Sequence, residues 1–140
     1  VDVSVLQSLN ELGLSTYLEQ KPFIPHHEVI ELMSTCSLLL LPLNNVKNQQ
    51  GIIPGKLFEY LASNQAILAI GPKTGDSAQI LQGQAITLVI DFDEMPEWTQ
   101  IEALCQGEIN RTETLQKYSR QELAKEMSGY MNELILKSSK

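Results

Sequence analysis

Hydrophobic residues along the chain fall into two patterns that alternate with each other. At residues 3–12 and 26–36 they recur every three or four positions, which predicts amphipathic helices. At 37–43 and 66–70 they follow one another almost without interruption, which is typical of strands buried on both faces of a parallel sheet. The alternation continues toward the C-terminus. The pattern therefore predicts an α/β fold, a parallel sheet with helices on both faces.

The first third of the chain has few elements with strong boundaries. Gly13 is expected to end the first helix, and residues 15–25 to form a short extended segment. The helix at 26–36 offers four apolar side chains for burial, namely Val29, Ile30, Leu32 and Met33. The chain opens without Met and enters a helical pattern at once, which predicts a piece of a longer protein.

Capping residues set the expected ends of the later elements. Pro54 or Gly55 opens a helix to about Ser63, with Leu57, Phe58, Leu61 and Ala62 toward the sheet. Asp76 or Ser77 is expected to cap the next helix.

A further strand is expected within residues 85–91, and Pro96 is expected near a helix start. A last helix is predicted over 113–136, with an apolar stripe at Leu115, Leu123, Met127, Met131 and Leu134.

Composition limits the function further. The chain has 140 residues and 43% hydrophobic content, which suits a single domain over 1–140. Its formal net charge of -7 disfavours binding to nucleic acid. Cys36 and Cys105 have no metal or redox spacing, and no apolar run approaches the roughly 20 residues that span a bilayer. We expect a cytoplasmic protein without a signal peptide or transmembrane segment.

Residues 51–62, GIIPGKLFEYLA, carry the most distinctive chemistry. Glycines at 51 and 55 allow close backbone approach and unusual dihedral angles, and Pro54 suits a first helical turn. The free N–H groups and positive dipole end of such a helix bind phosphate. Lys56 and Glu59 either form an ordinary exposed ion pair, worth about 0.2–0.5 kcal/mol, or serve a ligand. A carboxylate near such a turn can accept hydrogen bonds from ribose hydroxyls.

Residues 51–72, GIIPGKLFEYLASNQAILAIGP, resemble a segment of GT-B nucleotide-sugar glycosyltransferases close to the family 4 type. In that family a glycine-proline turn precedes a Lys-x-x-Glu-Tyr-x-Ala helix. Residues 23–43, 75–81 and 118–134 are similar to neighbouring parts of the same domain. The resemblance implies the C-terminal, Rossmann-like half of a GT-B fold. Its first strand and its N-terminal acceptor domain would precede Val1.

The resemblance also implies roles for individual residues. Glu59 falls where the second glutamate of the family's E-x7-E motif contacts the donor ribose. The diphosphate and sugar would lie near Gly51, Ile53, Pro54, Gly55 and Lys56, and the nucleobase near Ile24. Asn48, with Asn44 and Asn45, is either a ligand of sugar hydroxyls or a loop former.

Two features depart from the family pattern. Gly51 stands where many retaining members place the first glutamate, so retaining chemistry loses its expected carboxylate. The basic pair that neutralises the diphosphate would precede Val1. The resemblance thus implies a hexosyltransferase donor domain that needs no metal or cofactor. Its catalytic base is not visible, and the isolated chain is expected to be inactive.

The full enzyme would transfer a sugar from a nucleoside diphosphate to an acceptor, as in polysaccharide biosynthesis. Its partners would be the nucleotide-sugar and its own N-terminal domain, which would also provide any association with the inner face of the membrane. Two other functions stay open: a nucleotide-sugar epimerase of the same fold, and a non-catalytic α/β binding module. Adjacent His26 and His27 point apart and have no third ligand nearby in sequence, so they predict no metal site.

Overall fold

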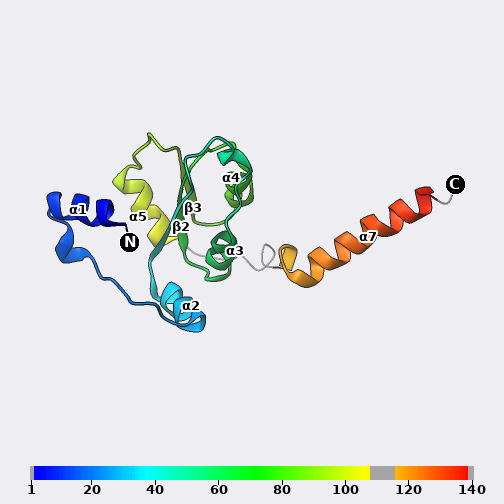
Figure 1. The fold of residues 1–140 in the computed structure, drawn as a ribbon, viewed down its shortest axis with the longest axis horizontal. Helices are drawn as coiled ribbons and strands as arrows, with labels where there is room; N and C mark the ends of the chain where they lie inside the picture. The colour runs from blue at the N-terminus through cyan, green and yellow to red at the C-terminus, as the bar shows by residue number, and fades with distance from the viewer. Residues whose placement is uncertain (1, 108–115, 139–140) are drawn as a thin grey trace.

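The structure is a computed structural model that describes residues 2–107 and 116–138 (Figure 1). Its elements follow the order α1 (Val3–Glu11), η1 (Ser15–Tyr17), α2 (His26–Thr35), β1 (Leu38–Pro42), η2 (Gln49–Gly51), α3 (Gly55–Ala62), β2 (Ala66–Ile70), α4 (Asp76–Leu81), β3 (Thr87–Ile90), α5 (Trp98–Gln106) and α7 (Arg120–Ser138).

The three strands form one open sheet in the order β1-β2-β3, and both pairs are parallel. Leu38 is aligned with Ala66 at the start of the first pair, and Ile67 with Thr87 in the second. This confirms the α/β class and the parallel sheet. All three expected strands lie where the runs of apolar residues predicted them.

Helices lie on both sides of this sheet, with α3 and α4 on one side and α5 on the other (Figure 1). On the first side a core joins the strands to two helices, through Leu41, Leu43, Leu57, Leu61, Ile67, Ala69 and Leu81. On the second side, Leu104 of α5 is buried and lines a space that Leu88 of β3 also borders. The sheet is therefore the middle layer.

Burial differs between β1 and β2, and here one prediction is wrong. The first four residues of β2 are all buried, as expected for a strand covered on both faces. In β1 burial alternates, and Leu40 keeps 51% of its surface exposed. The reason is that α5 packs over β2 and β3 and leaves the same face of β1 uncovered.

The N-terminal elements match the prediction only in part. Gly13 has a φ of +69°, the left-handed conformation that ends helices, which confirms the predicted stop of α1. A 3-10 turn at Ser15–Tyr17 replaces the start of the expected extended segment. In α2 only Met33 is buried, and Ile30 and Leu32 remain 38% and 39% exposed.

Helix capping differs from the prediction at α4, whereas the predicted helix start near Pro96 is confirmed at α5. The N-cap of α4 is Gly75, and neither Asp76 nor Ser77 caps it. Ser77 is instead buried, and its hydroxyl donates to the Ile52 carbonyl. Helix α5 begins after Pro96, at a capping box in which Glu97 and Gln100 satisfy each other's backbone N–H groups.

The last helix starts later than predicted. A turn at 118–119 precedes α7, and the Ser119 hydroxyl accepts the Glu122 N–H at 3.2 Å, as an N-cap residue does. This local hydrogen bond competes with a continuous helix through the same residues. The predicted start at 113 and the apolar residue Leu115 lie outside the described residues. Neither stretch 2–107 nor stretch 116–138 contains a helix with the length and hydropathy to cross a bilayer.

Candidate functional site

The candidate residues around Gly51 lie on the connection from β1 to α3. This loop leaves the carboxyl end of β1, where Leu43 still donates its N–H to the Ile70 carbonyl of β2. It then forms the short turn η2 and reaches Pro54, the N-cap of α3. Ligands of parallel α/β sheets bind at this edge, because loops there lead into helix N-termini.

No side chain caps the backbone N–H groups in the first turn of α3. Pro54 offers no capping side chain, and its carbonyl accepts the Leu57 N–H at 2.9 Å. Among the described residues, the N–H groups of Gly55 and Lys56 have no hydrogen-bond acceptor. These two donors, with the helix dipole behind them, suit an anionic ligand.

Gly51 and Gly55 leave open space beside this turn. A Cβ atom built on either glycine would have no neighbouring atom within 4 Å. Neither glycine has a positive φ, so the expectation of unusual dihedral angles is wrong. What the two glycines provide is the absence of a side chain above the helix N-terminus.

Glu59 stands one turn after Gly55 on the same side of α3. Helical side chains lean toward the N-terminus, and residues four positions apart share one side of a helix. Glu59 is half-buried, while Lys56 is exposed. The ion pairs of residues 2–107 and 116–138 do not include a Lys56–Glu59 pair, so the simple exposed-pair interpretation is wrong for these two side chains.

The opposite side of α3 fixes the helix on the sheet. Leu57 and Leu61 are 0% and 1% exposed, as the sequence predicted. Phe58 is only partly covered and contacts the ring of Tyr118, and Ala62 is exposed. Burial of two leucines therefore sets which side of the helix carries Glu59.

Tyr60, next to Glu59, is held neutral by its surroundings. Burial raises the pKa of its phenol, and nearby Cys36 and Glu59 raise the pKa further. Its hydroxyl lies 3.5 Å from the Leu40 carbonyl of β1, at the limit of a hydrogen bond. Tyr60 thus ties α3 to the edge strand and gives no sign of acting as an acid or base.

Contacts with α4 hold the loop before α3. The Ser77 hydroxyl donates to the Ile52 carbonyl at 2.6 Å, and Ser77 is 1% exposed. A Cβ on Gly75 would lie 3.1 Å from the Gln50 carbonyl oxygen, so the loop approaches α4 closely. The sequence indicated the loop, but nothing in it singled out Ser77 as its support.

Gln49 was also not predicted as a site residue. Its Oε1 atom is buried without a hydrogen-bond partner among the described residues. It lies in η2, directly after the exposed Asn48. A buried acceptor that lacks a donor is costly, which makes Gln49 a further polar group of this loop.

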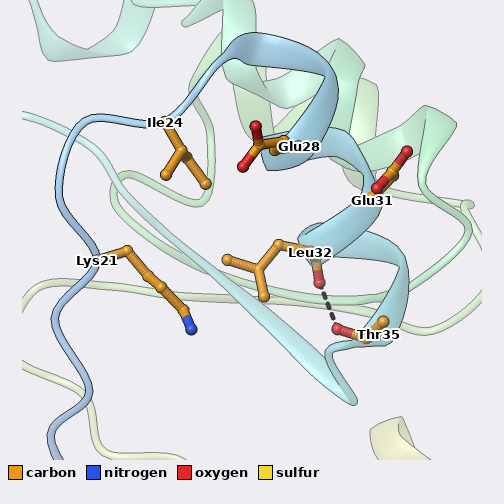
Figure 2. Close-up of a pocket in the computed structure, with 6 residues that line it drawn as sticks. All are labelled: Lys21, Ile24, Glu28, Glu31, Leu32 and Thr35. Carbon is orange, nitrogen blue, oxygen red and sulfur yellow. Dashed lines mark hydrogen bonds between the residues drawn. The ribbon is translucent and has the colours of Figure 1, made fainter.

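Ile24 belongs to a different cavity. Figure 2 shows it with Leu32, Lys21 and Glu28 around a space of about 330 Å³, which Glu31 and Thr35 also line. None of the other seven candidate residues lines this space. The cavity lies along α2, whose last turn adjoins the amino end of the sheet, since Gln65 Nε2 donates to the Ser34 carbonyl at 2.8 Å. Residues 48–59 thus lie on one connected segment, whereas Ile24 lines a cavity that none of the other candidates borders.

Histidines 26 and 27 open α2 and are exposed. In the part of the chain that the structure describes, no group of three His, Cys, Asp or Glu side chains could hold a metal ion.

Comparisons of this chain with protein-family models, with characterised proteins and with solved structures found no match. The functional interpretation therefore depends on the residues themselves.

Proposed function

We propose that this chain is the Rossmann-like, nucleotide-sugar-binding half of a GT-B glycosyltransferase. One observation carries the proposal: α3 follows the carboxyl end of β1, the N–H groups of Gly55 and Lys56 at its start have no acceptor among the described residues, and the half-buried Glu59 lies one helical turn after Gly55. This arrangement supports binding of a diphosphate and a ribose side by side. The full enzyme would transfer the sugar to an acceptor.

The diphosphate would be bound at the first turn of α3. The N–H groups of Gly55 and Lys56 have no hydrogen-bond acceptor among the described residues, and the Lys56 side chain is exposed. Local donors are needed because the chain carries a net charge of -7. As the sugar leaves, negative charge grows on the diphosphate, and donors fixed before the reaction stabilise that charge.

The ribose would be bound by Glu59. A carboxylate accepts hydrogen bonds from two neighbouring hydroxyl groups, and no cation among the described residues occupies this one. Because nothing lies within 4 Å of a Cβ at Gly51 or Gly55, a ligand can approach the backbone here. Gly51, Ile53, Pro54 and Asn48 would line the path toward the sugar.

The proposal is tested by titrating the chain with UDP, GDP and ADP while recording amide NMR spectra. We expect millimolar binding, about -4 kcal/mol, with shift changes concentrated at residues 48–60. Glu59→Gln should weaken binding about tenfold, because a hydrogen bond to a charged group contributes about 1.5 kcal/mol or more. The nucleotide that binds most tightly would identify the base.

Glu102→Gln is the matched control, since Glu102 is an exposed helical carboxylate on α5, away from the residues of the candidate site. It should leave nucleotide binding unchanged. Gly55→Ala adds one methyl group to open space in the site and should reduce affinity without loss of fold. Shift changes scattered over the chain, or equal in wild type and Glu59→Gln, would contradict the donor site.

A further inference from the structure

A second polar cavity lies on the α4 side of the same loop. It has a volume of about 310 Å³, opens to solvent, and is lined by Ile53, Asp76, Gln79, Ile80, Lys117 and Tyr118. These residues come from three separate parts of the chain: the loop before α3, the helix α4 and the residues just before α7. Of the predicted site residues only Ile53 borders it, so the cavity adjoins the proposed donor site but does not include Gly55, Lys56 or Glu59.

Hydrogen bonds and ring contacts hold the three parts of the chain around this cavity together. The hydrogen bond from Ser77 to the Ile52 carbonyl joins the loop to α4. The ring of Tyr118 packs on Phe58 of α3, with centroids 5.4 Å apart and the planes tilted by 55°. Lys117 places its ammonium 5.4 Å from the centre of the same tyrosine ring. The cavity is therefore largely formed before any ligand binds, as small-molecule sites usually are.

The lining combines hydrogen-bonding groups with apolar walls. Asp76 is an acceptor and Lys117 a donor, and the two do not form an ion pair. Gln79 offers an amide whose nitrogen is 3.4 Å from the Thr74 carbonyl, a weak hydrogen bond that a ligand can replace. Ile53 and Ile80 provide apolar surface between these polar groups.

We propose that this cavity binds a neutral pyranose sugar. Each hydroxyl of such a sugar both donates and accepts, so one hydroxyl can donate to the Asp76 carboxylate and its neighbour accept from Lys117. The C–H faces of the ring match Ile53 and Ile80. A zwitterionic ligand fits less well, because Asp76 and Lys117 are both exposed and ion pairs at exposed sites contribute little.

The test uses the whole 140-residue chain and the methyl pyranosides of glucose, galactose, mannose and N-acetylglucosamine, titrated to high millimolar concentration in amide NMR spectra. We expect at least one of them to shift the amides of Asp76, Gln79 and Lys117 together and to saturate. Asp76→Ala should weaken that binding about tenfold. Asp93→Ala, an exposed aspartate outside the cavity, should not change it.

One further variant and two further ligands make the result decisive. Lys117→Met removes a donor that lies outside α4, so its effect does not depend on the stability of that helix. Sorbitol, an open-chain polyol, and glycine, a zwitterion, are titrated separately as comparison ligands. No saturable shift with any pyranoside, equal shifts with sorbitol, stronger shifts with glycine, or unchanged binding in both Asp76→Ala and Lys117→Met would overturn the proposal. None of these outcomes depends on nucleotide binding at Glu59.

Discussion

Helices α3 and α7 both carry apolar residues at helical spacing, yet the leucines of α3 are buried and the apolar residues of α7 are exposed. Leu57 and Leu61 of α3 are 0% and 1% exposed, whereas Leu134 and Met127 of α7 are 66% and 61% exposed. The spacing of apolar residues shows which side of a helix is hydrophobic. It does not show whether the rest of the chain covers that side.

Topology explains the difference. Helix α3 connects β1 to β2, and these strands are parallel neighbours. A short crossover between parallel strands has to return along the sheet, so its helix packs there. Helix α7 comes after α5, and the described residues contain no strand beyond it that would require it to return along the sheet. In Figure 1 it extends away from the sheet.

The largest expected effect comes from removing a buried leucine of α3. Leu61→Ala should destabilise the fold by about 2–5 kcal/mol, because it loses buried surface and leaves a cavity in the core. Leu134→Ala on α7 is the matched change and should stay within about 0.5 kcal/mol. Urea unfolding followed by circular dichroism measures both. Equal losses of stability would show that α7 is buried in solution and would break the comparison.

A glycine substitution sharpens the same contrast. A Cβ on Gly71 would lie 2.6 Å from Cδ1 of Leu43, at the carboxyl end of the sheet. Gly71→Ala should therefore cost about 1–3 kcal/mol through overpacking. Gly129→Ala lies in open space on α7 and should stabilise that helix by up to about 1 kcal/mol. The same unfolding experiment applies, and a tolerated Gly71→Ala would mean that Leu43 moves freely.

The contact between Phe58 and Tyr118 joins the two regions and should have a smaller effect. Their ring centroids are 5.4 Å apart, and such aromatic pairs contribute about 0.5–1.5 kcal/mol beyond their buried area. A double-mutant cycle with Phe58→Ala and Tyr118→Ala should yield a coupling energy in that range. Strictly additive effects would mean that the turn at 118 does not rest on α3.

The smallest effect concerns an exposed ion pair. A hydrogen bond from Lys73, with one from the Asp91 N–H, lowers the pKa of Glu94. Because the folded pKa is depressed, the contribution to stability is present above the ordinary carboxyl pKa and is lost as the pH falls through the folded value. Lys73→Met should raise the pKa of Glu94 in an NMR titration. Lys125→Met on α7 should leave that pKa unchanged, and a shift of equal size there would contradict the assignment.

Much of the sheet could be predicted from the sequence, because uninterrupted apolar runs in β1 and β2 leave few alternatives. The start of α3 was also predictable, since Pro54 and Gly55 suit only the first turn. The exposure of Leu40 could not be predicted, because it depends on which strands α5 covers, and α5 lies far along the chain. The hydrogen bond from Ser77 to Ile52 was missed for the same reason, since serine at a helix start ordinarily caps its own helix.

The candidate site could be predicted to a similar extent. Residues 51–59 lie on one continuous segment, so local geometry alone brings Gly55 and Glu59 to one side of α3. Ile24 depends on the packing of α2, which the sequence pattern does not fix. The cavity at Asp76 and Lys117 joins three distant segments, and no spacing between them could have indicated it.

The parallel arrangement of the three strands also has a consequence for the order of folding. No hairpin can begin this sheet, because Leu38 pairs with Ala66 and Ile67 with Thr87, each across a helix. Strand pairings between residues far apart in sequence form slowly. The loop that carries Gly51 and Gly55 acquires its shape only when β1, α3 and β2 come together. The nucleotide binding proposed for this loop should therefore return with the slowest exchanging amides of β2 during refolding.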